Sequence, residues 1–252
     1  MNRQAALAIV IVASYVLARY CVYAMFSVYV PGAGFSWERW FIRDIYMSIP
    51  RLAALGLCLA VMRTNGGIGQ WAWHWRLQPL SGALVAGLTA SDILRWAGES
   101  RAARFSSMQI GVGWITTLPV AFFEEFCFRG LLFTALRDRL GARGAAFASS
   151  ALFAVYHVQA QGLTEWPKIF VFGIGACAAL HRGAGLPWLI LSHELIDGAW
   201  FHFGSDGALR PASPWLYWAG LALLIATAAV GWAAMNPSET PPSKVAAQAG
   251  LP

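Results

Sequence analysis

The amino-acid sequence predicts an all-α fold, a polytopic membrane helix bundle of about eight transmembrane helices around a buried polar cavity. Hydrophobic residues make up 58% of the 252 residues, and charged residues only 12%. A soluble globular domain carries about 25% charged residues, so this chain has too little polar surface for water and is suited to lipid. Many of its 13 Trp residues lie near the ends of apolar runs, as in the aromatic belt of a membrane interface.

Eight apolar runs predict the helices in order. They cover about residues 5–30, 45–62, 79–94, 108–136, 144–158, 166–180, 185–203 and 213–235. A spanning helix needs about 20 apolar residues, so the first, fourth and last runs are the clearest spans. The other runs are shorter or interrupted, and we interpret them as helices shielded inside the bundle. Seven spans are the alternative, if the run 79–94 is only partly inserted.

We expect residues 1–235 to form a single integral membrane domain. The first run is too long for the apolar core of a signal peptide, and Arg19 interrupts it rather than preceding it. We therefore expect this helix to stay in the mature protein. The tail, residues 236–252, is rich in Pro, Ser and Ala and is predicted to be disordered.

The charge pattern excludes a nucleic-acid-binding protein. The formal net charge is +6, but the arginines are scattered singly between apolar runs, as basic residues that flank membrane helices are. There is no basic cluster interleaved with aromatic residues and no nucleic-acid motif. Arg19 and Asp92 lie inside apolar runs, and we interpret them as snorkelling or lying near helix ends. The four cysteines are isolated and show no metal-ligand spacing.

Three ionisable residues interrupt the apolar stretch LPVAFFEEFCFRGLLF: Glu124, Glu125 and Arg129. A charge at the bilayer centre costs at least about 2.5 kcal/mol, so each such residue is a candidate for function. Glu125 and Arg129 are four residues apart, share a helix face and can pair. Glu124 is rotated from Glu125 by about 100° and is expected to remain available for chemistry. The alternative is a buried ion network that only holds helices together.

Two later apolar segments also carry ionisable residues. His157 follows Phe153 by one helical turn, so the two rings can pack side by side. His193 and Asp197 are four residues apart and share a helix face. A His-Glu-x-x-His zinc motif needs histidine at position 197, which argues against that kind of zinc site. A hydrogen-bonded core histidine at 157, and a polar pair between helices at 193 and 197, are the structural alternatives.

Taken together, the ordered motifs Glu-Glu-x-x-x-Arg, Phe-x-x-x-His and His-x-x-x-Asn/Asp resemble the CPBP family of intramembrane endopeptidases. This family is also called the CAAX-protease or Abi family and was formerly described as metalloproteases. The similarity covers about residues 108–203. It implies a membrane-embedded peptidase with a buried polar catalytic cavity, located in the cell membrane as a multi-pass protein.

The resemblance also implies roles for individual residues. Glu124 is expected to be the general base, with His157 helping to hold a water, and His193 with Asp197 to form the oxyanion site. Glu125, Arg129 and Phe153 are expected to support them. An ionised aspartate has no hydrogen to donate, so Asp197 either is protonated or orients His193, which then donates. We favour the second arrangement, since their spacing allows a direct contact.

The expected activity is hydrolysis of a peptide bond in a peptide or membrane-anchored protein, without a cofactor and in contact with the lipid bilayer. A zinc-dependent version would use Glu124, His157 and His193 as ligands, a set found in catalytic zinc sites. A non-catalytic membrane protein, such as a bacteriocin-immunity factor or a scaffold, is the rival from another class. A proton-coupled transporter would also use intramembrane Glu and His, but no internal repeat supports it.

Overall fold

The computed structural model describes residues 3–25, 29–30, 34–35, 37–64, 74–99, 105–203 and 213–235. Helices account for almost all of this part of the chain. They are α1 (Arg3–Met25), α2 (Trp37–Thr64), α3 (Pro79–Glu99), α4 (Ser107–Glu125), the π-helical segment η2 (Phe126–Phe133), α5 (Thr134–Gln161), α6 (Trp166–His181), α7 (Leu186–Phe203) and α8 (Pro214–Ala234). A two-residue antiparallel pair, β1 (Tyr29–Val30) with β2 (Gly34–Phe35), is the exception.

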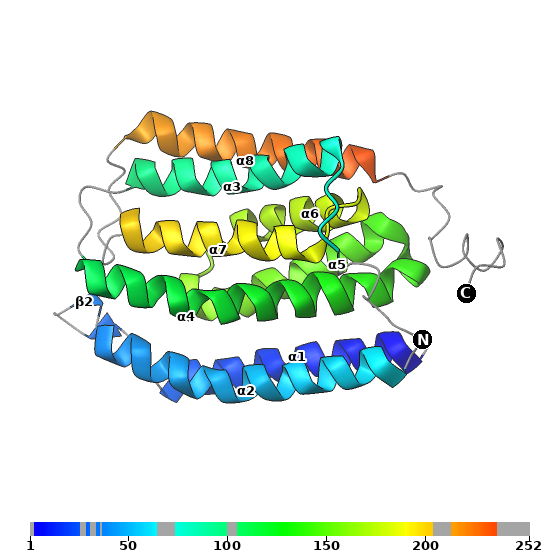
Figure 1. Cartoon of the computed structure of the whole chain (residues 1–252), viewed down its shortest axis with the longest axis horizontal. Helices are drawn as coiled ribbons and strands as arrows, with labels where there is room; N and C mark the ends of the chain where they lie inside the picture. The colour runs from blue at the N-terminus through cyan, green and yellow to red at the C-terminus, as the bar shows by residue number, and fades with distance from the viewer. Residues whose placement is uncertain are drawn as a thin grey trace.

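The helices lie roughly side by side in pairs that are not all consecutive in sequence (Figure 1). α3 packs on α8 at one edge of the bundle, and α1 packs on α2 at the opposite edge. Between these two pairs lie α4, η2, α5, α6 and α7, with α4 against α7 and α5 against α6. The middle layer therefore holds all three of the motifs identified in the sequence.

The chain changes direction at Gly141, inside α5. This residue has φ 68° and ψ 172°, a left-handed conformation that glycine adopts without the steric cost that a Cβ would impose. The break lies in the gap between the apolar runs 108–136 and 144–158. Beyond it, the second arm of α5 packs back along η2, where the hydroxyl of Ser149 donates to the carbonyl of Phe128 at 2.7 Å. This reversal brings residue 157 next to residue 124.

Within the described residues, three helical segments are long and apolar enough to cross a membrane: Ala6–Met25, Ser107–Gln161 and Pro214–Ala234. They overlap the three runs that the sequence marks as the clearest spans. The count of about eight spans stays a prediction. The predicted tail, residues 236–252, lies outside the described residues.

Large apolar side chains point outward from several helices. Leu17 of α1, Leu52 of α2, Ile115 of α4 and Trp215 of α8 are each more than 60% exposed. Beside its apolar core, the interior also buries arginines and glutamates, among them Arg19, Glu124, Glu125 and Arg129. This distribution, apolar outside and charged groups inside, is the one expected of an integral membrane protein.

Candidate active site

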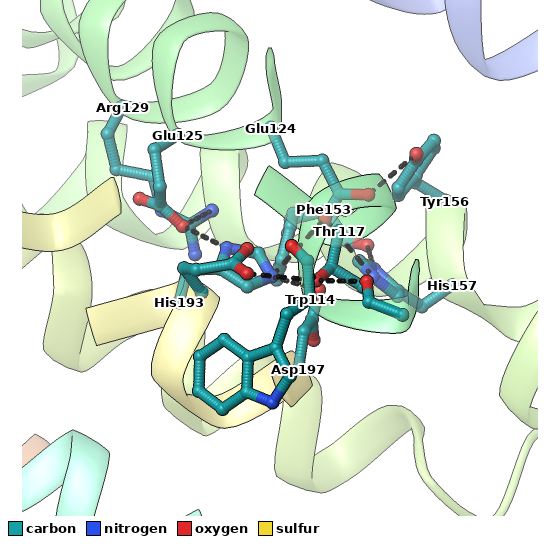
Figure 2. A network of polar contacts seen from close by, with 12 residues as sticks. Trp114, Thr117, Glu124, Glu125, Arg129, Phe153, Tyr156, His157, His193 and Asp197 are labelled. Carbon is teal, nitrogen blue, oxygen red and sulfur yellow. Dashed lines mark hydrogen bonds and ion pairs between the residues drawn. The ribbon is translucent and has the colours of Figure 1, made fainter. Parts of the chain in front are cut away.

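The three motifs meet at one place, where the end of α4, the second arm of α5 and α7 come together (Figure 2). Oε2 of Glu124 lies 3.4 Å from Nε2 of His157 and 3.7 Å from Nε2 of His193. All three side chains are buried, and Glu124 is 1% exposed. Two imidazole nitrogens thus converge on one carboxylate oxygen.

The ring of His157 is oriented by its own helix. Its Nδ1 lies 2.9 Å from the carbonyl oxygen of Phe153, one turn earlier. A carbonyl only accepts hydrogen bonds, so Nδ1 carries a hydrogen and Nε2 is the atom that faces Glu124. The Phe153 ring packs edge-on against the imidazole, with centroids 4.4 Å apart. The contact expected from their four-residue spacing is present.

Glu125 connects the first motif to the third. Its Oε1 lies 3.2 Å from Nη1 of Arg129, which is the pair expected from the spacing, and 2.8 Å from Nδ1 of His193. The guanidinium of Arg129 also lies 4.0 Å above the ring of Phe153. Arg129 and Glu125 are both fully buried, so each charge depends on the other for compensation.

Asp197 contacts His193 as an ion pair and not through a hydrogen bond. Its Oδ2 is 3.7 Å from Nε2 of His193, beyond hydrogen-bond distance, and its side chain is 31% exposed. The residue that orients the imidazole is Glu125, through the opposite ring nitrogen. Glu125 lies at the end of α4, which packs along α7, and so it reaches Nδ1, while Asp197 lies one turn further along α7.

Glu124 is not left without partners, in contrast to the expectation from its place on the helix. The hydroxyl of Tyr156 donates to its Oε1 at 2.7 Å, and Nη1 of Arg19 lies 3.7 Å from the same oxygen. Oε2 has no hydrogen-bond partner among the described residues. One carboxylate oxygen is therefore held by the protein, and the other faces the two histidines.

Arg19 and Tyr156 are the site residues that sequence reasoning missed. Arg19 was interpreted as snorkelling, but it is only 4% exposed and points into the bundle. Its position inside the first apolar run was the available signal, because an intramembrane cation needs an acidic partner. Tyr156 directly precedes His157, and nothing in its spacing marks it.

A π-helical segment begins immediately after the two glutamates. η2 spans Phe126–Phe133, and the hydroxyl of Thr134 donates to the carbonyl of Arg129, five residues earlier, at 3.1 Å. Segments of π-helix inside α-helices occur frequently at functional sites, since they change the direction in which side chains point. Here the segment carries Arg129, and its start fixes the end of α4 at Glu125.

A pocket opens beside the two histidines and contains about 530 Å³ of empty space, partly continuous with the outside. Its inner wall includes His157, His193 and Asp197. Aromatic and aliphatic side chains form the apolar part of its wall, and charged side chains also line it. The apolar residues are Trp96, Phe153, Ile169, Phe172, Ile196 and Leu224, and the charged ones are Asp92, Arg95, Glu165 and Lys168.

The charged residues that line the pocket pair with one another. Asp92 accepts from Arg95 at 2.8 Å, and Glu165 lies 2.5 Å from Lys168 and 3.9 Å from Arg95. These contacts join α3 to the start of α6. The pocket beside the histidines is thus lined by apolar side chains and by paired charged ones.

Glu194 lies outside this cluster. Its Oε1 accepts from the hydroxyl of Thr117 at 3.0 Å, between α7 and α4. This contact holds its carboxylate against α4 and gives it a role in packing the two helices.

In the part of the chain that the structure describes, no group of three or more His, Cys, Asp and Glu side chains is arranged to hold a metal ion. The residues of the alternative zinc set, Glu124, His157 and His193, converge without such an arrangement. Hydrolysis without a metal stays a prediction.

The comparison with protein families identifies the region that contains this site. The family model described as "Type II CAAX prenyl endopeptidase Rce1-like" matches residues 106–199. The resemblance drawn from the three motifs is confirmed over this segment, and the match supports a protease of the CAAX type. No curated protein and no solved structure matches the chain.

Proposed function

We propose that this chain, whose residues 106–199 belong to the CAAX-protease family, is a multi-pass endopeptidase of the cell membrane. It hydrolyses a peptide bond in a membrane-associated protein or peptide. The observation that carries the proposal is the position of Glu124, whose free Oε2 faces Nε2 of both His157 and His193 at 3.4 and 3.7 Å. A carboxylate and two imidazoles in a buried site are suited to activating a water.

In the proposed reaction, Glu124 is the general base. A water between Oε2 and Nε2 of His157 transfers a proton to Oε2 while its oxygen attacks the carbonyl carbon of the scissile bond. His157 accepts a hydrogen bond from the second hydrogen of that water through its unprotonated Nε2, and this hydrogen stays on the oxygen that becomes part of the product carboxyl group. The proton on Glu124 then passes to the leaving nitrogen, and the C–N bond breaks. This sequence returns the carboxylate to its starting form and needs no other reactant.

His193 is proposed to stabilise the oxyanion. Glu125 accepts the hydrogen of Nδ1, so in the doubly protonated ring Nε2–H points toward the position of the reacting carbonyl. A donor held in place before the reaction stabilises developing charge far better than one that must reorient. Oδ2 of Asp197 lies 3.7 Å from Nε2 of His193, so its carboxylate stabilises the positive charge of the imidazolium.

The pocket beside the histidines is proposed to hold the substrate segment next to the scissile bond. Its apolar wall fits the side chains of a membrane-associated peptide. The description of the matching family, a prenyl endopeptidase, points to peptides that carry a prenyl group. Prenylated peptides and other membrane-anchored peptides would bind in the same way. Each would place an extended segment in the pocket from the side of the bilayer.

The test compares Glu124→Gln with wild type in lipid nanodiscs. The probe is a farnesylated peptide ending in a Cys-aliphatic-aliphatic-X sequence, with a fluorophore and quencher on either side of the bond that follows the cysteine. An unprenylated version serves as the second probe. We expect wild type to cleave at least one probe and Glu124→Gln to lose at least about 100-fold in kcat. Glu194→Gln, a buried glutamate outside the cluster, is the matched control and is expected to retain turnover.

Full turnover by Glu124→Gln at normal membrane abundance would reject the assignment of Glu124 as the base. A protein that cleaves neither probe, and whose cellular phenotype survives Glu124→Gln, would instead fit the non-catalytic interpretation. In that case the cluster would act as an ion network between helices. Comparing the processed termini of membrane proteins in cells that carry wild type and Glu124→Gln would then identify any other substrate.

A further inference from the structure

We infer that α1 completes the active site, and that Arg19 and Tyr15 of this helix act with Tyr156 to position Glu124. The inference rests on the proposed function, since it assigns these residues a role in holding the proposed base. α1 lies outside residues 106–199, the segment that matches the family model. The three motifs therefore do not contain everything that the site uses.

A chain of hydroxyl groups leads from α1 to the base. Tyr156 donates its single hydroxyl hydrogen to Oε1 of Glu124 at 2.7 Å. Its oxygen lies 3.0 Å from the hydroxyl of Tyr15, so Tyr15 is the donor in that second contact. Tyr156 is fully buried and Tyr15 is 3% exposed. Hydrogen bonds in such a series polarise and strengthen one another in a medium of low dielectric constant.

Arg19 adds a charge to the same oxygen. Its Nη1 is 3.7 Å from Oε1 of Glu124, and its Cζ lies 3.8 Å from the centre of the Tyr156 ring. A guanidinium that is stacked on an aromatic face and also near a carboxylate is fixed in two directions. Arg19 therefore contacts both Glu124 and the tyrosine that binds it.

The charges of the cluster divide into two matched pairs. Glu125 is compensated by Arg129 of its own helical run, at 3.2 Å. Glu124 is compensated by Arg19, which comes from a different helix. Leaving either carboxylate buried without its cation would be costly, because a buried charge in a membrane needs a partner. This division explains why α1 carries an arginine in the middle of an apolar run.

The contacts leave the reactive side of Glu124 open. Tyr156 and Arg19 both approach Oε1, while Oε2 faces the histidines and has no hydrogen-bond partner among the described residues. A contact made only for packing would not need to spare one oxygen. Holding one oxygen fixes the direction of the other, and a displacement of about 1 Å can cost about 100-fold in rate.

The first experiment measures kcat and KM for Tyr156→Phe, Arg19→Met and Arg19→Lys with the farnesylated probe. We expect Tyr156→Phe and Arg19→Met to lower kcat about 10- to 100-fold with KM within about twofold of wild type. Arg19→Lys keeps the charge and should recover part of kcat. Tyr20→Phe is the matched control, because the Tyr20 hydroxyl also joins α1 to α5, donating to the carbonyl of Val155 at 2.7 Å, but it does not contact Glu124.

Equal losses in Tyr20→Phe and Tyr156→Phe would overturn the inference, since α1 would then act only by packing on α5. Unchanged kcat in Tyr156→Phe and Arg19→Met would overturn it as well. A rise in KM at constant kcat would assign these residues to binding rather than to positioning the base, which also contradicts the inference.

The second experiment does not depend on turnover. Thermal unfolding is measured for Arg19→Met, Glu124→Gln and the double variant. Arg19→Met should lower the midpoint by at least about 5 °C in the wild-type background and by much less beside Glu124→Gln, where no carboxylate remains to be compensated. Equal shifts in the two backgrounds would show that Arg19 and Glu124 are not partners. If the shift depends strongly on Glu124 but neither probe is cleaved, the pairing of Arg19 with Glu124 is supported. Only the proposed function is then contradicted.

Discussion

The carboxylate of Glu125 accepts a hydrogen bond from Nδ1 of His193 at 2.8 Å. This contact joins the first and third motifs, and it gives the two consecutive glutamates separate partners. Glu125 faces Arg129 and α7, whereas Glu124 faces α1, Tyr156 and the histidine nitrogens. The difference follows from the rotation of about 100° between neighbouring residues on a helix. Two adjacent carboxylates can therefore do different work without competing for the same cation.

The Glu125–Arg129 pair is expected to behave as a coupled unit. Arg129→Met leaves the Glu125 carboxylate buried without its guanidinium and should destabilise the protein by about 3–5 kcal/mol. Adding Glu125→Gln should recover a large part of that loss, because no uncompensated charge then remains. Thermal unfolding in detergent measures both effects, with the exposed Arg139→Met as control. Additive losses in the double variant would contradict the pairing.

Asp197 is expected to tolerate an amide. Asp197→Asn supplies an N–H donor beside His193 and should keep kcat within about tenfold of wild type, since Glu125 still holds the imidazole. Asp197→Leu removes both the charge and the donor and should lower kcat further at similar KM. Steady-state kinetics with the farnesylated probe make the comparison. A loss in Asp197→Asn as large as that in Glu124→Gln would show that the carboxylate itself is required.

Hydrolysis is expected to proceed without a metal ion. Purified protein treated with a strong chelator and then freed of it should retain its turnover, because the proposed reaction uses only Glu124 and the two histidines. Addition of Zn²⁺ to the treated protein should not raise the rate. Activity that disappears with the chelator and returns with zinc would establish the zinc-dependent alternative, with Glu124, His157 and His193 as ligands.

Gly198 is expected to be required for the approach of α7 to α4. A Cβ at this position would lie 2.4 Å from ring atoms of Trp114, so Gly198→Ala must displace the Trp114 side chain or move one of the two helices. These helices carry Glu124 and His193, and we expect a loss of about 1–3 kcal/mol in stability and about tenfold or more in kcat.

Gly111→Ala is the matched control for that substitution. Gly111 lies on α4 as well, with no atom within 4 Å of the Cβ position, so alanine should be neutral or stabilise by up to about 1 kcal/mol. Thermal unfolding and kcat are measured for both variants. Equal behaviour of Gly111→Ala and Gly198→Ala would contradict the role assigned to close helix packing.

The positions of the helices could be predicted because lipid imposes a simple rule. Backbone polar groups inside a membrane must be satisfied within the segment, so an apolar run of sufficient length becomes a helix. Each of the eight runs overlaps a helix of the structure, and the gap between runs 108–136 and 144–158 contains the reversal at Gly141. The π-helical geometry of Phe126–Phe133 could not be predicted, since no residue in it breaks an α-helical pattern.

The sequence by itself identified the candidate site residues and showed which of them can pair along one helix. Glu125 with Arg129, and Phe153 with His157, follow from a four-residue spacing whose geometry is local. Only the tertiary structure decided that Glu125 is hydrogen-bonded to His193 whereas Asp197 lies 3.7 Å from it, and that Arg19 and Tyr156 contact Glu124. The rotation and depth of one helix against another come from the packing of the whole bundle. Contacts between helices therefore depend on residues far away in the chain. The spacing of residues within a single helix cannot predict them.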